Sequence, residues 1–280
     1  MNKIIDGRKV RDDLVEKLKK RVQNLSNELR LDVILVGNNS ASNVYVNNKR
    51  KLAQEIGIKF VLHHFPDDVE SEVIENLIKE LNCNSAVTGF MVQLPLPKHI
   101  NEQKICNLIK KEKDVDGFTI ENTGLLAIND NAIIPCTPKG IMYLLDYYGI
   151  KVSGKNVVII GRSNIVGRPL ISCMLNNDAT VTVCHSKTEN LKFYTKNADI
   201  LIVAIGKPKY IDESYIKDGA IVIDVGINRV DGKIVGDCDF DSMYDKVSYI
   251  TKVPGGVGPM TVAMLMLNII EVGEYNESSK

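Results

Sequence analysis

One stretch of the sequence, residues 157–170, decides the fold, and it reads Val-Val-Ile-Ile-Gly-Arg-Ser-Asn-Ile-Val-Gly-Arg-Pro-Leu. Its first four residues are typical of a buried strand, and Gly161 lets the backbone turn tightly where that strand ends. Amides at the start of the following helix can then bind a pyrophosphate. The pattern departs from Gly-x-Gly-x-x-Gly, because Ser163 replaces the second glycine and the last is displaced to Gly167. A tight strand–helix turn without a ligand therefore stays an alternative.

The strand expected at Thr180–Cys184 favours NADP over NAD. In NAD-binding domains this strand ends in a carboxylate that hydrogen-bonds the ribose hydroxyls, and a carboxylate would repel a 2′-phosphate. Here residues 185–188 read His-Ser-Lys-Thr, without an acid. Ser186 and an arginine, Arg162 or Arg168, could hold the phosphate, and we assign no role to the histidine.

Strand-length apolar runs alternate with helix-period segments along the chain. The strands are expected at 33–36, 60–63, 86–92, 157–160, 180–184, 200–204 and 221–225. In the first half, helices are expected at 10–25, 45–56 and 73–81. Because strands separated by helices need crossover connections, we predict two α/β domains flanking a cleft, the second a Rossmann-type doubly wound parallel sheet.

Two proline- and glycine-rich breaks divide the chain. Pro-Cys-Thr-Pro-Lys-Gly at 135–140 opens a helical pattern for which Thr137 is the expected N-cap, and Pro-Gly-Gly-Val-Gly-Pro occupies 254–259. We predict a first domain over 1–136, a second over 137–259, and a last helix over 260–280 that packs back on the first.

The composition narrows the possible partners. The 35 basic residues balance 35 acidic ones, so no net charge attracts nucleic acid or an anionic membrane. The six cysteines are scattered without a Cys-x-x-Cys pair, which favours a reducing cytoplasm. The longest apolar run, around 262–272, is too short to span a bilayer. We expect no metal, because His63-His64 alternates faces on a strand without nearby cysteine or acid ligands.

A helix expected over residues 40–57 carries an unusual lysine. Tyr45, Lys49, Leu52 and Ile56 follow a four-three-four spacing, so they share one face, and the two aliphatic residues mark that face as the inward one. A partly desolvated lysine is suited to proton transfer. The alternative is that its side chain extends to solvent from the domain edge.

Two further segments point to the same end of the first domain. The strand expected at 86–92 runs into Gln93-Leu-Pro-Leu-Pro, which places an amide at a carboxyl end, where open α/β sheets bind ligands. Residues 113–118 read Lys-Asp-Val-Asp-Gly-Phe, with Asp114 and Asp116 beside a glycine. For these acids a charged turn is the alternative.

Taken together, these segments closely resemble the bifunctional methylenetetrahydrofolate dehydrogenase/methenyltetrahydrofolate cyclohydrolase family. They occur in one order across nearly the whole chain: Tyr45-x-x-x-Lys49, Gln93-Leu-Pro-Leu-Pro, Asp114-Val-Asp-Gly, Pro135-Cys-Thr-Pro-Lys-Gly, Gly161-Arg-Ser-x-Ile-Val-Gly-Arg-Pro and Pro254-Gly-Gly-Val-Gly-Pro-Met-Thr. Cys238 stands where the family pattern leads us to expect valine, and we attach little weight to that exchange of one small residue for another.

The resemblance implies a cytoplasmic homodimer in one-carbon metabolism. It would oxidise 5,10-methylenetetrahydrofolate to the methenyl form with NADP and then hydrolyse that product to 10-formyltetrahydrofolate. Lys49 would be the catalytic lysine, held by Gln93 and Tyr45; Tyr45 would stack on the folate and Asp116 would bind the pterin. The loop residues implied to border the folate are Pro254, Gly255, Gly258 and Pro259. Those implied to bind the cofactor are Gly161, Arg162, Ser163, Ile165, Val166, Ser186 and Ile227.

Two other functions are alternatives to this one. A monofunctional dehydrogenase of the same family would lack the hydrolytic step, and the presence of Lys49 argues against it. A non-catalytic folate- or NADP-binding protein would be expected to have lost a member of the Tyr45, Lys49, Gln93 and Asp116 set, which is intact here.

Overall fold

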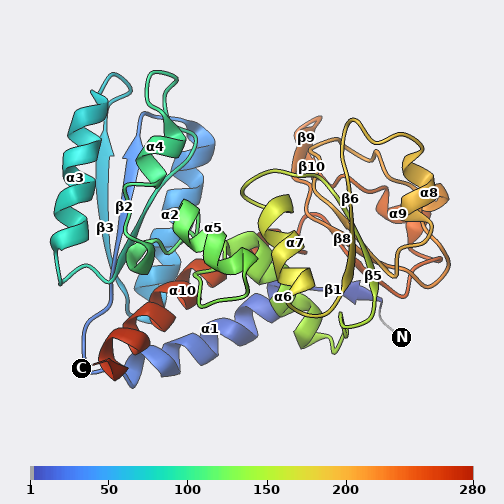
Figure 1. Cartoon of the computed structure of the whole chain (residues 1–280), viewed down its shortest axis with the longest axis horizontal. Helices are drawn as coiled ribbons and strands as arrows, with labels where there is room; N and C mark the ends of the chain where they lie inside the picture. Colours follow the sequence, from blue (N-terminus) through green and yellow to red (C-terminus); the bar gives the residue numbers. More distant parts are fainter. Residues whose placement is uncertain (1–2, 280) are drawn as a thin grey trace. The chain divides into compact units, whose positions relative to one another are not determined.

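The computed structural model describes residues 3–279, which divide into two units (Figure 1). One unit, here called the central-segment unit, contains Thr137–Thr261 and the N-terminal residues up to Asp12. The other, here called the flanking-segment unit, contains Asp13–Cys136 and the residues from Val262 onward. Each unit is therefore assembled from two separate pieces of chain. Which unit holds which ligand stays a prediction.

The central-segment unit is built on a six-stranded sheet in the order β1-β11-β8-β7-β5-β6. All neighbouring strands in it are parallel. The strands are β1 (Ile4–Ile5), β5 (Asn156–Ile160), β6 (Thr180–Cys184), β7 (Ile200–Val203), β8 (Ile221–Asp224) and β11 (Tyr249–Thr251). The chain passes from β5 out to β6 and returns to β7 on the other side of β5, which makes a topological switch point at β5. The predicted doubly wound sheet is confirmed.

Shorter elements complete this unit. They are α6 (Cys136–Tyr147), α7 (Gly167–Leu175), α8 (Leu191–Thr195), η2 (Glu213–Tyr215), α9 (Phe240–Met243) and the antiparallel pair β9 (Asn228–Val230) and β10 (Lys233–Val235). The predicted N-cap Thr137 is wrong, since α6 already includes Cys136. Pro138 still lies in the first turn, where the missing N–H removes no helical hydrogen bond.

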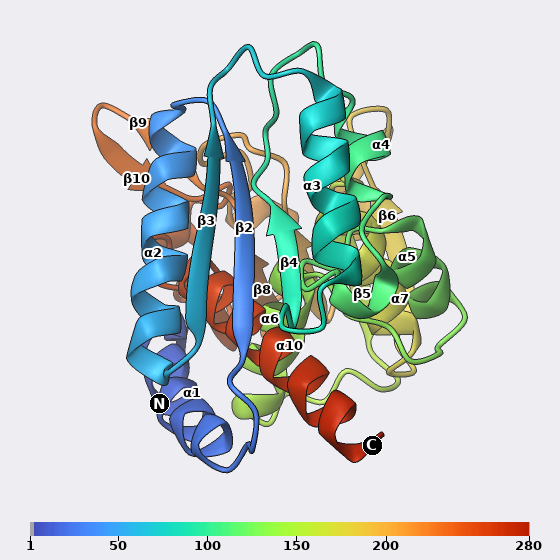
Figure 2. The same cartoon turned by 90° about the vertical axis from the view of Figure 1, so that its left-hand side faces the viewer.

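The flanking-segment unit contains a three-stranded parallel sheet in the order β3-β2-β4 (Figure 2). Its strands are β2 (Arg30–Val36), β3 (Lys59–Phe65) and β4 (Gly89–Val92), and its helices and turns are α2 (Ser40–Ile56), α3 (Ser71–Cys83), α4 (Glu102–Cys106), η1 (Lys111–Lys113) and α5 (Ile120–Ala127). Figures 1 and 2 show α3 on one face of the sheet and α2 on the other. The α3 side is packed by apolar residues such as Ile74, Ile78 and Phe90.

Helix α2 forms where the sequence predicts it, and both of its ends are capped. The Asn39 side chain accepts hydrogen bonds from the amides of Ala41 and Ser42, and Gly57 ends the helix in the left-handed conformation at φ 87°. These are the ordinary devices for pairing the orphan amides and carbonyls of helix ends.

Two long helices belong to both units. Helix α1 (Gly7–Gln23) passes from one unit into the other after Asp12, and α10 (Gly258–Ser278) does so after Thr261. Within residues 3–279, no helix is both long and apolar enough to cross a membrane.

Candidate active site

Lys49 is the buried lysine that the helical spacing predicts. Only 7% of it is exposed, and its Nζ donates hydrogen bonds to Gln93 Oε1 at 2.9 Å and to Met91 Sδ at 3.1 Å. Burying an ammonium is unfavourable unless acceptors surround it. The alternative, a side chain extending to solvent, is therefore wrong for this lysine.

Gln93 is held so that its side-chain oxygen faces the lysine. Its backbone amide continues the β2–β4 pairing by donating to Ile34 O at 2.8 Å, and its Nε2 donates to Leu94 O at 2.7 Å. Met91 lies two residues earlier on β4, and alternate residues of a strand share a face. The sequence analysis missed Met91, although this two-residue spacing from Gln93 is the signal that could have found it.

Tyr45 is not on the inward face, so that part of the prediction is wrong. The tyrosine is 43% exposed, while the buried residues of α2 include Ser42, Val46, Lys49 and Ala53. Val46, and not Tyr45, occupies the inward position one turn before Lys49. The tyrosine ring is thereby left free of the core and available to a flat ligand.

Asp116 is the second charged group at this site. The carboxyl is partly buried; desolvation raises its pKa above the ordinary value, and the nearby Lys49 ammonium opposes that rise. The Cys136 thiol donates to Asp116 Oδ1 at 3.6 Å. Lys49, Gln93 and Asp116 are therefore brought together within the flanking-segment unit.

Asp114 has a structural task. It is buried, its Oδ1 accepts from the Gly117 amide at 3.0 Å, and its Oδ2 accepts from the Thr119 amide at 2.9 Å and from Asn122 Nδ2 at 3.0 Å. Gly117 adopts φ 71°, and a Cβ there would lie 2.4 Å from Ile133 O. The charged-turn alternative is thus correct for Asp114, whereas Asp116 lies near enough to Lys49 for the ammonium to oppose the rise of its pKa.

The turn after β5 is folded tightly around two glycines. Gly161 adopts φ 124°, and a Cβ on it would lie 2.3 Å from Ala204 O at the end of β7. A Cβ on Gly167 would lie 2.3 Å from Gly161 O. These two glycines let the backbone fold tightly against itself, while Arg162, Ser163 and Ile165 are exposed.

Helix α7 begins at this turn with amides directed to the loop. Its N-cap residue, Val166, has an apolar side chain that cannot accept a hydrogen bond. Ser163 Oγ receives only a long contact from the Gly167 amide, at 3.5 Å. The Arg168 amide donates to Ser163 O at 3.0 Å and Pro169 has no N–H, so Gly167 supplies the first-turn amide that is left for an anion. The helix dipole also favours a pyrophosphate at this end.

The other residues predicted at the cofactor site follow neighbouring strands of the same sheet. Ser186 is exposed in the acid-free turn after β6, where the His185 amide donates to Thr188 Oγ1 at 2.9 Å. Ile227 is exposed after β8, and a Cβ on Gly258 would lie 3.6 Å from its Cδ1. Pro254, Gly255 and Pro259 also belong to this unit, not to that of Lys49.

Two buried carboxylates, which lie in segments that also resemble the family but were assigned no role, shape the loops after β7 and β8. Asp237 accepts from the amides of Ile205, Gly206 and Lys207 at 2.7, 3.0 and 2.8 Å. Asp224 accepts from three further amides, those of Gly226, Asp237 and Cys238. Burial nevertheless raises the pKa of Asp224 to about 6.

Asp224 leads us to expect that stability falls as the pH rises. Its pKa is about 6 in the folded chain against an ordinary 3.8, so the folded state retains a proton that the unfolded state has lost between these values. The contribution of Asp224 to the free energy of unfolding should then decrease by about 2 kcal/mol from pH 4 to pH 7. Urea unfolding of the wild type and of Asp224→Asn over this range measures it. A difference between the two proteins that does not vary with pH would contradict the expectation.

The expectation that His63 and His64 have no acid nearby is wrong for His63. Its Nε2 lies 2.7 Å from Asp32 Oδ1 on the adjacent strand β2, so an acid is nearby after all. Asp32 also accepts two hydrogen bonds from the Arg30 guanidinium. Among residues 3–279, no group of three or more histidine, cysteine or acidic residues is arranged to hold a metal ion.

Two family models match this chain. The model of the tetrahydrofolate dehydrogenase/cyclohydrolase catalytic domain matches residues 5–116, and that of the NAD(P)-binding domain of the same enzymes matches residues 135–277. The resemblance identified from the sequence motifs is therefore confirmed.

Individual relatives agree over nearly the full length. The bifunctional protein FolD of Ligilactobacillus salivarius is 54% identical, with 97% of this chain and 96% of the relative covered. The FolD crystal structure from Campylobacter jejuni superposes with a TM-score of 0.96 at 46% identity, covering 98% of this chain and 99% of that one. The Trypanosoma brucei FolD, solved with NADP and an inhibitor, gives 0.92 at 37% identity, with 98% of each chain covered. This chain belongs to the tetrahydrofolate dehydrogenase/cyclohydrolase family.

Proposed function

We propose that this protein oxidises 5,10-methylenetetrahydrofolate to 5,10-methenyltetrahydrofolate with NADP and then hydrolyses the product to 10-formyltetrahydrofolate. The observation that carries the proposal is the buried Lys49, which is hydrogen-bonded to Gln93 and lies near Asp116. A chain that only bound folate, or only oxidised it, would have no need of a buried lysine beside the reacting carbon.

The folate contacts follow from the residue types at the site. A pterin presents adjacent N–H donors, and the Asp116 carboxylate can accept both in a charge-assisted pair. The exposed Tyr45 ring offers a stacking surface for the folate. The loop that carries Pro254, Gly255, Gly258 and Pro259 borders the substrate in this proposal.

The hydrolytic step needs proton movement that Lys49 can provide. Water adds to the methenyl carbon between N5 and N10, and the C–N5 bond then opens. The lysine Nζ accepts a proton from the attacking water or donates one to the leaving nitrogen. Gln93 Oε1 and Met91 Sδ hold the Lys49 Nζ in place. These two residues are therefore positioning residues for the proton transfer.

The cofactor site lies on the turn between β5 and α7. Gly161, Ser163, Ile165 and Val166 hold the pyrophosphate against the helix N-terminus, and Ile227 lies against another part of the cofactor. Arg162 and Ser186 hold the 2′-phosphate. NADP, when bound, accepts the hydride from the methylene carbon, and the chain's part in this step is to position the two reactants.

Replacing Arg162 by alanine should narrow the preference for NADP over NAD. A guanidinium–phosphate contact is charge-assisted, so we expect the ratio of the two kcat/KM values to fall about tenfold or more. Steady-state assays with each nucleotide measure this ratio, and Arg168→Ala, in the first turn of α7, is the matched control. If Arg168→Ala narrows the preference and Arg162→Ala does not, the 2′-phosphate is held by Arg168.

One assay tests the proposed function as a whole. The protein is mixed with methylenetetrahydrofolate and NADP, and reduced cofactor and the methenyl chromophore are followed together. We expect the cofactor to be reduced while the methenyl signal rises briefly and then decays. Lasting accumulation of the methenyl product would indicate a dehydrogenase alone, and an absence of cofactor reduction would contradict the proposal.

Family membership also supports a homodimer located in the cytoplasm. Sedimentation of the purified protein at micromolar concentration would test the dimer, which should appear at twice the chain mass of 31.1 kDa.

A further inference from the structure

Asn268 is a buried amide in the most apolar part of α10. It is 1% exposed, and its neighbours Met266, Leu267, Ile269 and Ile270 are buried hydrophobic residues. Removing a primary amide from water is unfavourable unless its hydrogen bonds are replaced. The partners of this side chain should therefore indicate its task.

The amide nitrogen of Asn268 joins two segments that are adjacent to Asp116. It donates to Val115 O at 2.8 Å and to Ile134 O at 3.1 Å. Val115 immediately precedes Asp116 in the chain. Ile134 lies two residues before Cys136, whose thiol contacts Asp116 Oδ1. Both segments that fix the carboxylate are thus tied to one side chain of α10.

The backbone around Asp116 has little freedom to relax. On the far side of the aspartate, the Gly117 amide is held by Asp114. Val115 is packed closely against β4, since a Cβ on Gly89 would lie 2.3 Å from Val115 Cγ1. Loss of the Asn268 hydrogen bonds would therefore remove a donor from the half-buried Ile134 carbonyl and leave the buried Val115 carbonyl with a 3.8 Å contact from the Cys136 thiol. The segment cannot easily turn these carbonyls to water.

We infer that Asn268 is a positioning residue, whose amide holds the Val115 and Ile134 carbonyls so that the Asp116 carboxylate stays directed at the pterin. The inference rests on the proposed function, because it takes Asp116 as the group that binds the pterin. It assigns to the C-terminal helix a part in substrate binding without contact with the substrate.

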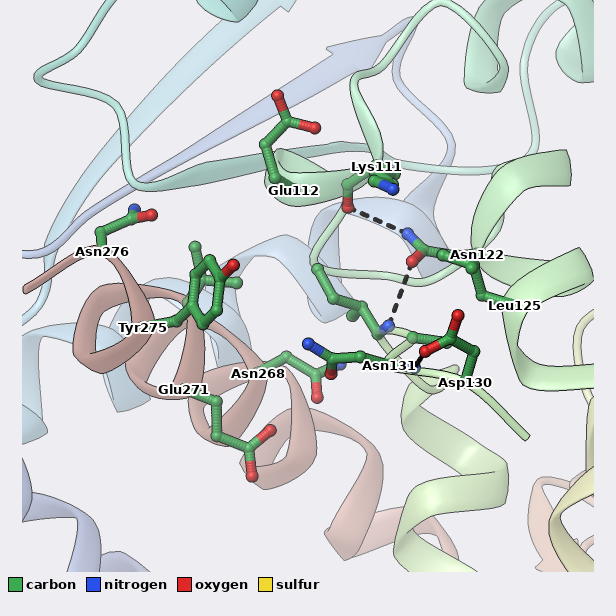
Figure 3. Close-up of a pocket in the computed structure, with 13 residues that line it drawn as sticks. Lys111, Glu112, Asn122, Leu125, Asp130, Asn131, Asn268, Glu271, Tyr275 and Asn276 are labelled. Atoms are coloured by element: carbon green, nitrogen blue, oxygen red, sulfur yellow. Dashed lines mark hydrogen bonds between the residues drawn. The ribbon is translucent and has the colours of Figure 1, made fainter. Parts of the chain in front are cut away.

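A residue of the cavity that Asn268 helps to line serves as a matched control. The cavity has a volume of about 700 Å³, and its lining includes Asn122, Asn268, Tyr275 and Asn276 (Figure 3). Figure 3 also shows the Asn122 side chain hydrogen-bonded to the Lys111 carbonyl. The Asn122 Oδ1 accepts a further hydrogen bond from the Ile133 amide at 3.1 Å. Asn276 is an exposed asparagine on the same helix as Asn268 and lines the same cavity.

The test compares Asn268→Leu, which has a similar shape and no donor, with Asn268→Ser, which keeps one donor. For Asn268→Leu we expect the KM for methylenetetrahydrofolate to rise about tenfold, the equivalent of one lost buried hydrogen bond. The serine variant should show a smaller rise. The KM for NADP should change less than about twofold, and Asn276→Ala should behave as the wild type. If Asn268→Leu does not fold, Asn268→Ser carries the test alone.

A double-mutant cycle with Asp116→Asn separates this inference from the proposed function. Once Asp116→Asn has weakened folate binding, adding Asn268→Leu should raise the KM little further, because both changes act through one carboxylate. Additive effects, or a folate KM unchanged by both Asn268 variants, would overturn the inference alone. A folate KM unchanged by Asp116→Asn would instead overturn the assigned pterin site.

Discussion

Lys49→Ala abolishes the hydrolysis of methenyltetrahydrofolate: this is the largest effect that we expect from a single substitution. General acid–base catalysis contributes about 10²- to 10⁴-fold to a rate, and Lys49 is the proton-transfer group in the proposed mechanism. NADP binding should persist, because the turn Gly161–Gly167 belongs to the other unit. The measurement is the decay of the methenyl chromophore, with cofactor reduction recorded in the same reaction.

Lys51→Ala is the matched control for that experiment. Lys51 lies on the same helix and is exposed, so its removal should leave both activities unchanged. Hydrolysis at the wild-type rate in Lys49→Ala would refute the role given to this lysine. Such a result would move the proton transfer to a group outside α2.

The second large effect that we expect is that Asp116→Ala weakens folate binding by about 10²-fold or more. Two charge-assisted hydrogen bonds to the pterin would be lost, and each is worth about 1.5–3 kcal/mol. Titration calorimetry with the folate and separately with NADP measures the effect, and only the folate affinity should fall. Asp130→Ala, at an exposed acid of the same unit, is the control. An unaltered folate affinity would count against the pterin assignment.

The main outline of the fold could be predicted because its central strands are long apolar runs. Strands β5, β7 and β8 are buried on both faces, and such strands stand out in a sequence. Strands β1 and β11 were missed because they contain two and three residues. A run so short has no measurable period, and its pairing comes from the neighbouring strand.

Only those parts of the site that depend on residues close together in the sequence could be predicted. The spacing of residues in α2 correctly predicted a buried Lys49, but it wrongly predicted that Tyr45 is buried as well. Four residues are more than one helical turn, so a residue four positions away is rotated off the buried face. The buried residue one turn before Lys49 is Val46. Cys136 contacts Asp116, which lies 20 residues earlier in the chain. Asn268 contacts Cys136, which lies 132 residues earlier. No local period carries such pairings, since they arise only when distant segments pack together.

The two helices shared by both units set the order in which the chain can finish folding as it is synthesised. The flanking-segment unit needs Asn268 and the apolar residues beside it to fill its interior, and these emerge after the whole of Thr137–Thr261. Synthesis proceeds from the N-terminus, and domains generally fold as units. The flanking-segment unit, most of which is encoded before Thr137, is therefore completed last. Until α10 leaves the ribosome, the nascent chain keeps the Lys49 helix and its sheet without their final covering helix, a state that exposes apolar surface to chaperones.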